Sequence, residues 1–173
     1  MISLIIGGSA CGKSAFAENM LSQTDSKNKI YIATMLKYGD AETLARINKH
    51  KKMREKKNFK TLECPYSLGE LTFLKTDAIL LECMSNLVAN EMFVKNNQNI
   101  ENEIINAVNN INAKDIIIVT NNVFEDTLDY SEETKNYLKT LAKVNIALAK
   151  IATNVYEIRS GVHFLIKGEN YDK

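Results

Sequence analysis

A glycine-rich octapeptide at residues 7–14 (GGSACGKS) constrains this chain more than any other segment. It follows an apolar run at residues 2–6 and precedes a helix-forming segment, which is the context in which the pattern G-x-x-x-x-G-K-[ST] forms a phosphate-binding P-loop. Gly7 and Gly12 allow the backbone to curl so that successive N–H groups point at a polyphosphate, and the helix N-terminus adds its dipole. A glycine-rich turn without a ligand fits these flanks less well. The pattern therefore predicts that the chain binds a nucleoside triphosphate.

Each part of the octapeptide has an expected role in this chemistry. We expect nucleotide contacts from Gly7, Gly8, Ser9, Ala10, Cys11, Gly12, Lys13 and Ser14. Lys13 would act as a catalytic residue by reaching the β- and γ-phosphates, and the Ser14 hydroxyl would ligate Mg²⁺. The motif therefore predicts ATP or GTP as a substrate and Mg²⁺ as the cofactor.

Strand-like and helix-like segments alternate along the chain. The strand-like segments are residues 2–6, 29–33, 78–81, 115–120, 155–158 and 162–166, and the helix-length segments are residues 14–22, 40–57, 85–94, 100–111 and 131–153. Residues 78–81 and 116–119 are continuously apolar, which is typical of parallel strands covered on both faces. A short Arg-Ser-Gly connection between the last two strands predicts an antiparallel hairpin at the sheet edge. We therefore expect an α/β three-layer sandwich with a mostly parallel sheet, formed by a single domain of residues 1–173.

Charge and cysteine content narrow the range of partners and compartments. The chain has 173 residues, a net charge of +1 and 25% charged residues, which argues against an electrostatic nucleic-acid binder. Its three cysteines have irregular spacing and indicate neither a disulfide framework nor a C-x-x-C metal pair. The apolar runs are too short for a membrane span. We expect a cytoplasmic protein that binds neither nucleic acid nor a membrane.

A basic segment carries the second candidate site. Arg46, His50 and Arg54 are spaced four residues apart, which places them on one face of a helix. The arginines would bind phosphate oxygens and disfavour protonation of the histidine, because like charges repel. A neutral imidazole in this position can act as a nucleophile or a base on a phosphate. On spacing alone, a solvated basic face with an incidental histidine is the commoner explanation.

Polar residues end two of the buried strands. Glu82 follows the strand at residues 78–81, at the edge of the sheet where open α/β folds bind ligands. We expect it to be the second Mg²⁺ contact, directly or through water, with an ordinary strand-end carboxylate as the alternative. Residues 120–122 end the next strand and indicate ligand contact more weakly. Asn145, on an apolar helix face, is either a satisfied core amide or a group turned toward a ligand or subunit boundary.

In their order along the chain, these motifs resemble the adenosylcobinamide kinase / adenosylcobinamide-phosphate guanylyltransferase family of cobalamin biosynthesis. The matching segments are the P-loop, Tyr31-Ile32-Ala33-Thr34, Arg46-Ile47-x-x-His50-Lys51, Leu80-Leu81-Glu82-Cys83, Asn90, Val119-Thr120-Asn121-x-Val123, Val144-Asn145 and Ser160-Gly161. The resemblance covers nearly the whole chain. It implies a RecA-like P-loop fold that is commonly assembled as a homotrimer.

The resemblance also implies a two-step chemistry. Members of the family phosphorylate adenosylcobinamide and then transfer GMP from GTP to adenosylcobinamide phosphate through a guanylylated histidine, whose position falls on His50. By the same resemblance, Thr34, Arg46 and Arg54 contact the nucleotide. The implied partners are ATP or GTP and the corrinoid.

The chain departs from the family pattern on one side of the expected site. Asn122 and Phe124 stand where members usually carry Glu and Gly, and residues 137–139 (YLK) replace a Phe-Arg-Asp run. Ala142 and Ile146, near Asn145, differ as well. These changes concern a substrate or subunit surface and leave the nucleotide residues intact. Two other functions therefore stay open: a small-metabolite P-loop kinase without a covalent intermediate, and a non-catalytic nucleotide-binding regulator.

Overall fold

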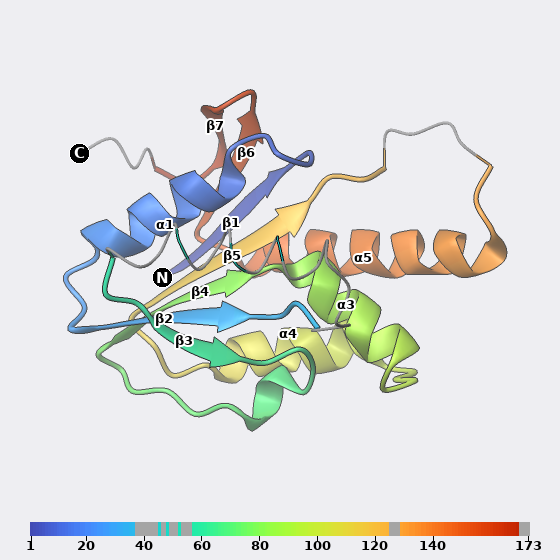
Figure 1. Ribbon diagram of the computed structural model, residues 1–173, viewed down its shortest axis with the longest axis horizontal. Coiled ribbons are helices and arrows are strands. Elements are labelled where there is room, and N and C mark those ends of the chain that lie inside the picture. Colours follow the sequence, from blue (N-terminus) through green and yellow to red (C-terminus); the bar gives the residue numbers. More distant parts are fainter. Residues whose placement is uncertain (37–44, 46–47, 49–51, 53–56, 125–128, 170–173) are drawn as a thin grey trace.

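The described part of the chain forms a seven-stranded sheet with the order β3-β2-β4-β5-β1-β6-β7 (Figure 1). The computed structural model describes residues 1–36, 45, 48, 52, 57–124 and 129–169. The strands are β1 (Ile2–Gly7), β2 (Asn28–Ala33), β3 (Lys60–Glu63), β4 (Asp77–Glu82), β5 (Asp115–Asn121), β6 (Asn154–Arg159) and β7 (Val162–Lys167). Neighbouring strands are parallel except β6 and β7. The predicted mostly parallel sheet with a C-terminal antiparallel hairpin is confirmed.

The central strands β4 and β5 are buried on both faces. In β4, Ile79 and Leu81 belong to the core on one face of the sheet, and Ala78 and Leu80 belong to the core on the other. Successive side chains of a strand point to opposite faces, so a continuously apolar strand needs cover on both sides. The same alternation places the side chain of Glu82 on the face of Leu80.

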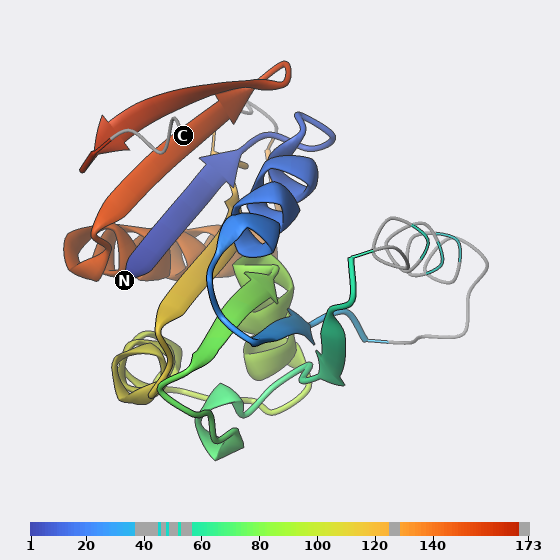
Figure 2. The same ribbon diagram turned by 90° about the vertical axis from the view of Figure 1, so that its left-hand side faces the viewer.

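Helices supply this cover, and the fold has three layers (Figure 2). The helices are α1 (Lys13–Gln23), α3 (Met84–Phe93), α4 (Ile100–Asn110) and α5 (Glu132–Ile151), with a short 3₁₀ turn at Leu68–Glu70. On one face, α1 buries Ala17, Met20 and Leu21. On the other face, α3, α4 and α5 pack together over the larger core. Of the helices that the structure describes, none is long and apolar enough to cross a membrane.

The structure adds one strand to the expected set. β3 pairs in parallel with β2 at the edge of the sheet. The apolar alternation that predicts strands is missing here, because Leu62 alone of its four residues is apolar. The helix expected at residues 40–57 lies mostly outside the described residues. Its described members Ala45, Asn48 and Lys52 are helical and exposed.

The β6–β7 hairpin turns at Ser160 and Gly161, whose φ angles are 49° and 82°. Two consecutive positive φ angles are typical of a type I′ turn, which favours glycine. The Gly161 amide donates to the Cys11 carbonyl oxygen at 2.8 Å. The ring of His163 in β7 stacks on Phe16 of α1, with 4.9 Å between the centroids. The hairpin therefore packs against both the P-loop and the helix that follows it.

Candidate active site

The P-loop connects the carboxyl end of β1 to the N-terminus of α1. β1 ends at Gly7, α1 begins at Lys13, and Gly12 caps the helix with a φ angle of 103°. The Phe16 amide donates to the Gly12 carbonyl oxygen at 3.1 Å and so begins the helical hydrogen bonding. Glycine adopts this left-handed conformation without the steric cost that a side chain brings. The backbone therefore requires the second glycine of the motif.

Gly7 is needed for a different reason, which is its close approach to β6. A Cβ atom at this position would lie 2.5 Å from the Ile158 carbonyl oxygen and 2.8 Å from the Cys11 sulfur. The corresponding position at Gly8 has nothing within 4 Å. The loop therefore starts against the sheet and then leaves it. The sequence carries no signal for this contact, since β6 lies far along the chain.

Lys13 lies inside the loop that it follows. The residue is 6% exposed, and its ammonium group donates to the Gly8 carbonyl oxygen. The same nitrogen lies 3.8 Å from the Cys11 sulfur. A buried positive charge at a helix N-terminus attracts an anion. The predicted role of Lys13 toward the nucleotide phosphates is consistent with this position.

Ser14 and Glu82, the two residues predicted to bind Mg²⁺, are in direct contact. The Ser14 hydroxyl donates to the Oε1 atom of Glu82. The phenol of Tyr31 donates to the other carboxylate oxygen, Oε2, at 3.1 Å. Hydroxyl, carboxylate and phosphate oxygens are the ligands that Mg²⁺ takes in nucleotide sites. The donor set fits the ion, which would neutralise phosphate charge.

A magnesium ion here would depend on the nucleotide for most of its ligands. Within the described residues, no group of three or more His, Cys, Asp or Glu side chains could hold a metal ion. Mg²⁺ is usually bound by one or two protein oxygens together with substrate phosphates and water. The pair of Ser14 and Glu82 matches that arrangement.

Thr34 lies at the carboxyl end of β2, at the same end of the parallel strands as Glu82, but its side chain faces inward. It is completely buried, and its hydroxyl both donates to the Cys83 carbonyl oxygen at 2.8 Å and accepts from the Cys83 amide at 2.7 Å. The Asn90 amide group donates to the carbonyl oxygens of Thr34 and Pro65, both at 2.8 Å. The Thr34 side chain is thus occupied in fixing the end of β4. A direct contact between its hydroxyl and a nucleotide would require this network to open.

The carboxyl end of β5 meets α3 and α5 through side-chain amides. The Asn121 side-chain amide donates to the Ser85 hydroxyl at 2.6 Å, and the Thr120 hydroxyl donates to the side-chain Oδ1 atom of Asn145 at 2.7 Å. Asn145 is 6% exposed and also donates to the Asn121 carbonyl oxygen at 3.4 Å. Of the two interpretations of Asn145, the structure supports the satisfied core amide.

A thiol and a phenol beside this end of β5, those of Cys83 and Tyr137, are protonated and neutral at physiological pH. Burial raises the pKa of the Cys83 thiol and raises the pKa of the Tyr137 phenol to about 12. The Cys83 sulfur lies 3.0 Å from the Ser85 hydroxyl, and the Tyr137 hydroxyl donates to the Ser85 carbonyl oxygen at 3.3 Å. These groups can recognise a ligand by hydrogen bonding and not by charge.

The basic face expected from Arg46, His50 and Arg54 lies outside the described residues. The chain is described again from Lys57, whose ammonium group forms an ion pair with Oε2 of Glu18 at 2.7 Å. Glu18 lies on α1 and is completely buried. An ion pair therefore links the chain that follows the basic segment to the P-loop helix α1.

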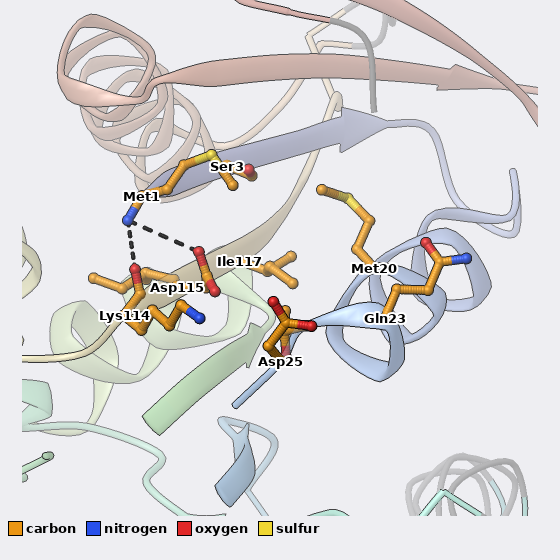
Figure 3. Close-up of a pocket in the computed structure, with 10 residues that line it drawn as sticks. Met1, Ser3, Met20, Gln23, Asp25, Lys114, Asp115 and Ile117 are labelled. Carbon is orange, nitrogen blue, oxygen red and sulfur yellow. Dashed lines mark hydrogen bonds and ion pairs between the residues drawn. The ribbon is translucent and has the colours of Figure 1, made fainter. Parts of the chain in front are cut away.

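A cavity lies at the amino ends of the central strands, opposite the P-loop (Figure 3). It has a volume of about 500 Å³ and is lined by the amino ends of β1 and β5 and by the end of α1, including Met1, Met20 and Asp115. The Met1 amine donates to the Lys114 carbonyl oxygen at 2.6 Å, as Figure 3 shows. Open α/β sheets bind their ligands at the carboxyl ends of the strands. This cavity is therefore separate from the P-loop site.

A solved structure from Pyrococcus horikoshii OT3 has a similar fold. It aligns with 98% of this chain and 87% of its own, with a TM-score of 0.55 and 10% sequence identity. At this identity the likeness concerns the fold alone. It agrees with the three layers described above.

Sequence relatives identify the family. The bifunctional adenosylcobalamin biosynthesis protein CobU of Salmonella typhimurium is 32% identical, over 96% of this chain and 100% of the relative. The protein of the same name from Escherichia coli is 29% identical with the same coverage. The sequence model of the family described as cobinamide kinase / cobinamide phosphate guanyltransferase matches residues 3–166. The family and the P-loop fold predicted from the motifs are confirmed, and the chain belongs to the cobinamide kinase / cobinamide phosphate guanyltransferase family.

Proposed function

We propose that this chain catalyses both reactions of its family: it phosphorylates adenosylcobinamide, and it transfers GMP from GTP to adenosylcobinamide phosphate. The observation that carries the proposal is the contact of Ser14 with Glu82 beside Lys13. This contact brings two oxygen groups together at the carboxyl ends of the parallel strands, and the cation Lys13 directly precedes Ser14. A Mg²⁺–nucleotide complex needs these groups in this place.

In the kinase step, Lys13 and the loop amides would hold the triphosphate for in-line attack by the corrinoid alcohol. A hydroxyl oxygen of the corrinoid side chain forms a bond to the γ-phosphorus, the bond from that phosphorus to the bridging oxygen breaks and releases the nucleoside diphosphate, and the hydroxyl proton passes to solvent water. Lys13 and the loop amides stabilise the negative charge that develops on the phosphoryl oxygens. Ser14 and Glu82 would hold Mg²⁺, which neutralises the same charge when bound.

In the second step, His50 is the proposed nucleophile. A ring nitrogen of His50 bonds to the α-phosphorus of GTP, and pyrophosphate leaves. A phosphate oxygen of the corrinoid phosphate then attacks the same phosphorus and releases the histidine. The resemblance of residues 46–51 to the family pattern supports this role, and Arg46 and Arg54 would hold phosphate oxygens and keep the imidazole neutral.

Residues 1–173 are proposed to fold as one domain that works as a homo-oligomer, a trimer by resemblance, in the cytoplasm. Apolar side chains exposed along β7 support an association between copies: Val162, Phe164 and Ile166 are 55%, 47% and 61% exposed. An exposed apolar stripe of this kind is typical of a protein interface. The three cysteines are free thiols, as expected in a reducing compartment.

Separate assays of the two half-reactions test the proposal. Lys13→Ala should lower both rates by at least roughly 10²-fold, the usual cost of removing a group that stabilises transition-state charge. Lys114→Ala is the matched control, because it removes the same charge at the opposite edge of the sheet. Kinase turnover without GMP transfer would favour a plain P-loop kinase. Nucleotide binding without either reaction would favour a regulator. Unchanged rates in a folded Lys13→Ala protein would exclude the P-loop site.

A further inference from the structure

The two oxygens of the Glu82 carboxylate have different partners. Oε1 accepts from the Ser14 hydroxyl at the start of α1, and Oε2 accepts from the Tyr31 phenol at 3.1 Å. One oxygen therefore faces the P-loop, while the other is held from within the sheet. Tyr31 itself is 3% exposed and belongs to the core beneath α1.

The strand register explains how Tyr31 reaches Glu82. β2 and β4 are parallel, and Tyr31 lies opposite Leu80 while Ala33 lies opposite Glu82. Leu80 and Glu82 are two residues apart, so their side chains point to the same face as Tyr31. Diagonal neighbours on one face of a sheet lie within the reach of an aromatic side chain. The phenol is thus directed at the carboxylate by two paired strands.

We infer that Tyr31 is a positioning residue for the metal–nucleotide site. This inference rests on the proposed function of Ser14 and Glu82 as Mg²⁺ ligands. The terminal torsion of a glutamate is broad, so an unrestrained carboxylate samples many orientations. The hydrogen bond to Oε2 fixes the plane of the carboxylate and leaves Oε1 directed at the Ser14 side. Removing a group that hydrogen-bonds to a metal ligand typically lowers the metal affinity 10- to 100-fold.

Tyr31→Phe tests this inference, because it removes the hydroxyl and retains the buried ring. Tyr156→Phe is the matched control: Tyr156 is completely buried in the same core, and its hydroxyl donates to the Glu169 carbonyl oxygen at 3.2 Å. Each variant removes one tyrosine hydroxyl, and both tyrosines belong to the same hydrophobic core. Any general loss of stability therefore appears in both.

The direct readout is Mn²⁺ binding, measured by electron paramagnetic resonance in the presence of α,β-methylene-GTP, whose α–β bond cannot be cleaved by a nucleophile. Tyr31→Phe should weaken Mn²⁺ binding about 10-fold, with unchanged binding of the nucleotide in EDTA. Tyr156→Phe should change the Mn²⁺ affinity less than about 2-fold. In a Glu82→Ala background, Tyr31→Phe should have no further effect, because the group that it positions is gone.

Equal Mn²⁺ affinity in the wild type and in Tyr31→Phe would overturn the inference while leaving the proposed function intact. Equal losses in Tyr31→Phe and Tyr156→Phe would overturn it too, since they would indicate a general effect on the core. A wild-type protein that binds the nucleotide analogue but no Mn²⁺ would contradict both the inference and the proposed metal site.

Discussion

Replacing Gly7 with alanine tests the packing of the P-loop on the sheet. The new Cβ atom would lie 2.5 Å from the Ile158 carbonyl oxygen and 2.8 Å from the Cys11 sulfur. The oxygen belongs to the backbone of β6 at the position paired with Gly7, so it cannot move away without disturbing the β1–β6 pairing. Overpacking of a well-filled site typically costs 1–3 kcal/mol, and a backbone obstacle places this substitution in the upper part of that range, about 2–3 kcal/mol.

Gly8→Ala is the control for this prediction. It makes the same chemical change one residue later, where a Cβ atom meets nothing within 4 Å. We expect a change in the free energy of unfolding of about 0.5 kcal/mol or less, the usual range for substitutions away from packed features. Urea unfolding of the nucleotide-free proteins measures both values. For a chain of this length, the melting temperature of Gly7→Ala should fall by roughly 4–12 °C.

The comparison of the two alanine variants decides the outcome. Equal stabilities for Gly7→Ala and Gly8→Ala would refute the account of how the loop begins. A Gly7→Ala protein as stable as the wild type would do the same. The expected result also includes weaker nucleotide binding by Gly7→Ala, because relief of the clash displaces Cys11 and the loop with it.

Two further predictions concern buried groups. Lys57→Met should lower the free energy of unfolding by about 3 kcal/mol, because it leaves the completely buried Glu18 carboxylate without its ion-pair partner. A loss below about 1 kcal/mol in urea unfolding would show that the ion pair does not offset the cost of burying the Glu18 charge. Iodoacetamide at pH 7.5 should label the partly exposed Cys11 before Cys64, because burial raises the pKa of Cys64 to about 11 and keeps its thiol protonated until the pH approaches that value. GTP should slow the labelling of Cys11, and peptide mass spectrometry that finds Cys64 labelled first would contradict this order.

The parts of the fold that the sequence predicts are those with a strong local signal. The P-loop combines fixed glycine positions with a strand before it and a helix after it, and β4 and β5 each contain a run of four apolar residues. The position of Glu82 followed from the end of β4 and the rule that ligands bind at the carboxyl edge. The structure brings Glu82 into contact with Ser14, and its role as a Mg²⁺ ligand stays a prediction.

The rest depends on contacts that no local pattern encodes. β3 is short, polar and held by pairing with β2, so its sequence does not distinguish it from a loop. Thr34 lies in a segment that resembles the family pattern, but whether its hydroxyl faces a ligand or the Cys83 backbone is decided by the pairing of β2 with β4. The close approach of Gly7 to Ile158 depends on the β1–β6 register. Pairing between distant strands determines all three.

The most direct test of the central claim is the covalent state of the protein after incubation with α-³²P-labelled GTP and Mg²⁺. We expect acid-labile, base-stable label on the wild-type chain, release of one pyrophosphate for each label, and transfer of the label to added adenosylcobinamide phosphate. His50→Ala should bind GTP and take up no label. Label on a different residue, or GMP transfer by a His50→Ala protein at the wild-type rate, would contradict the proposed chemistry.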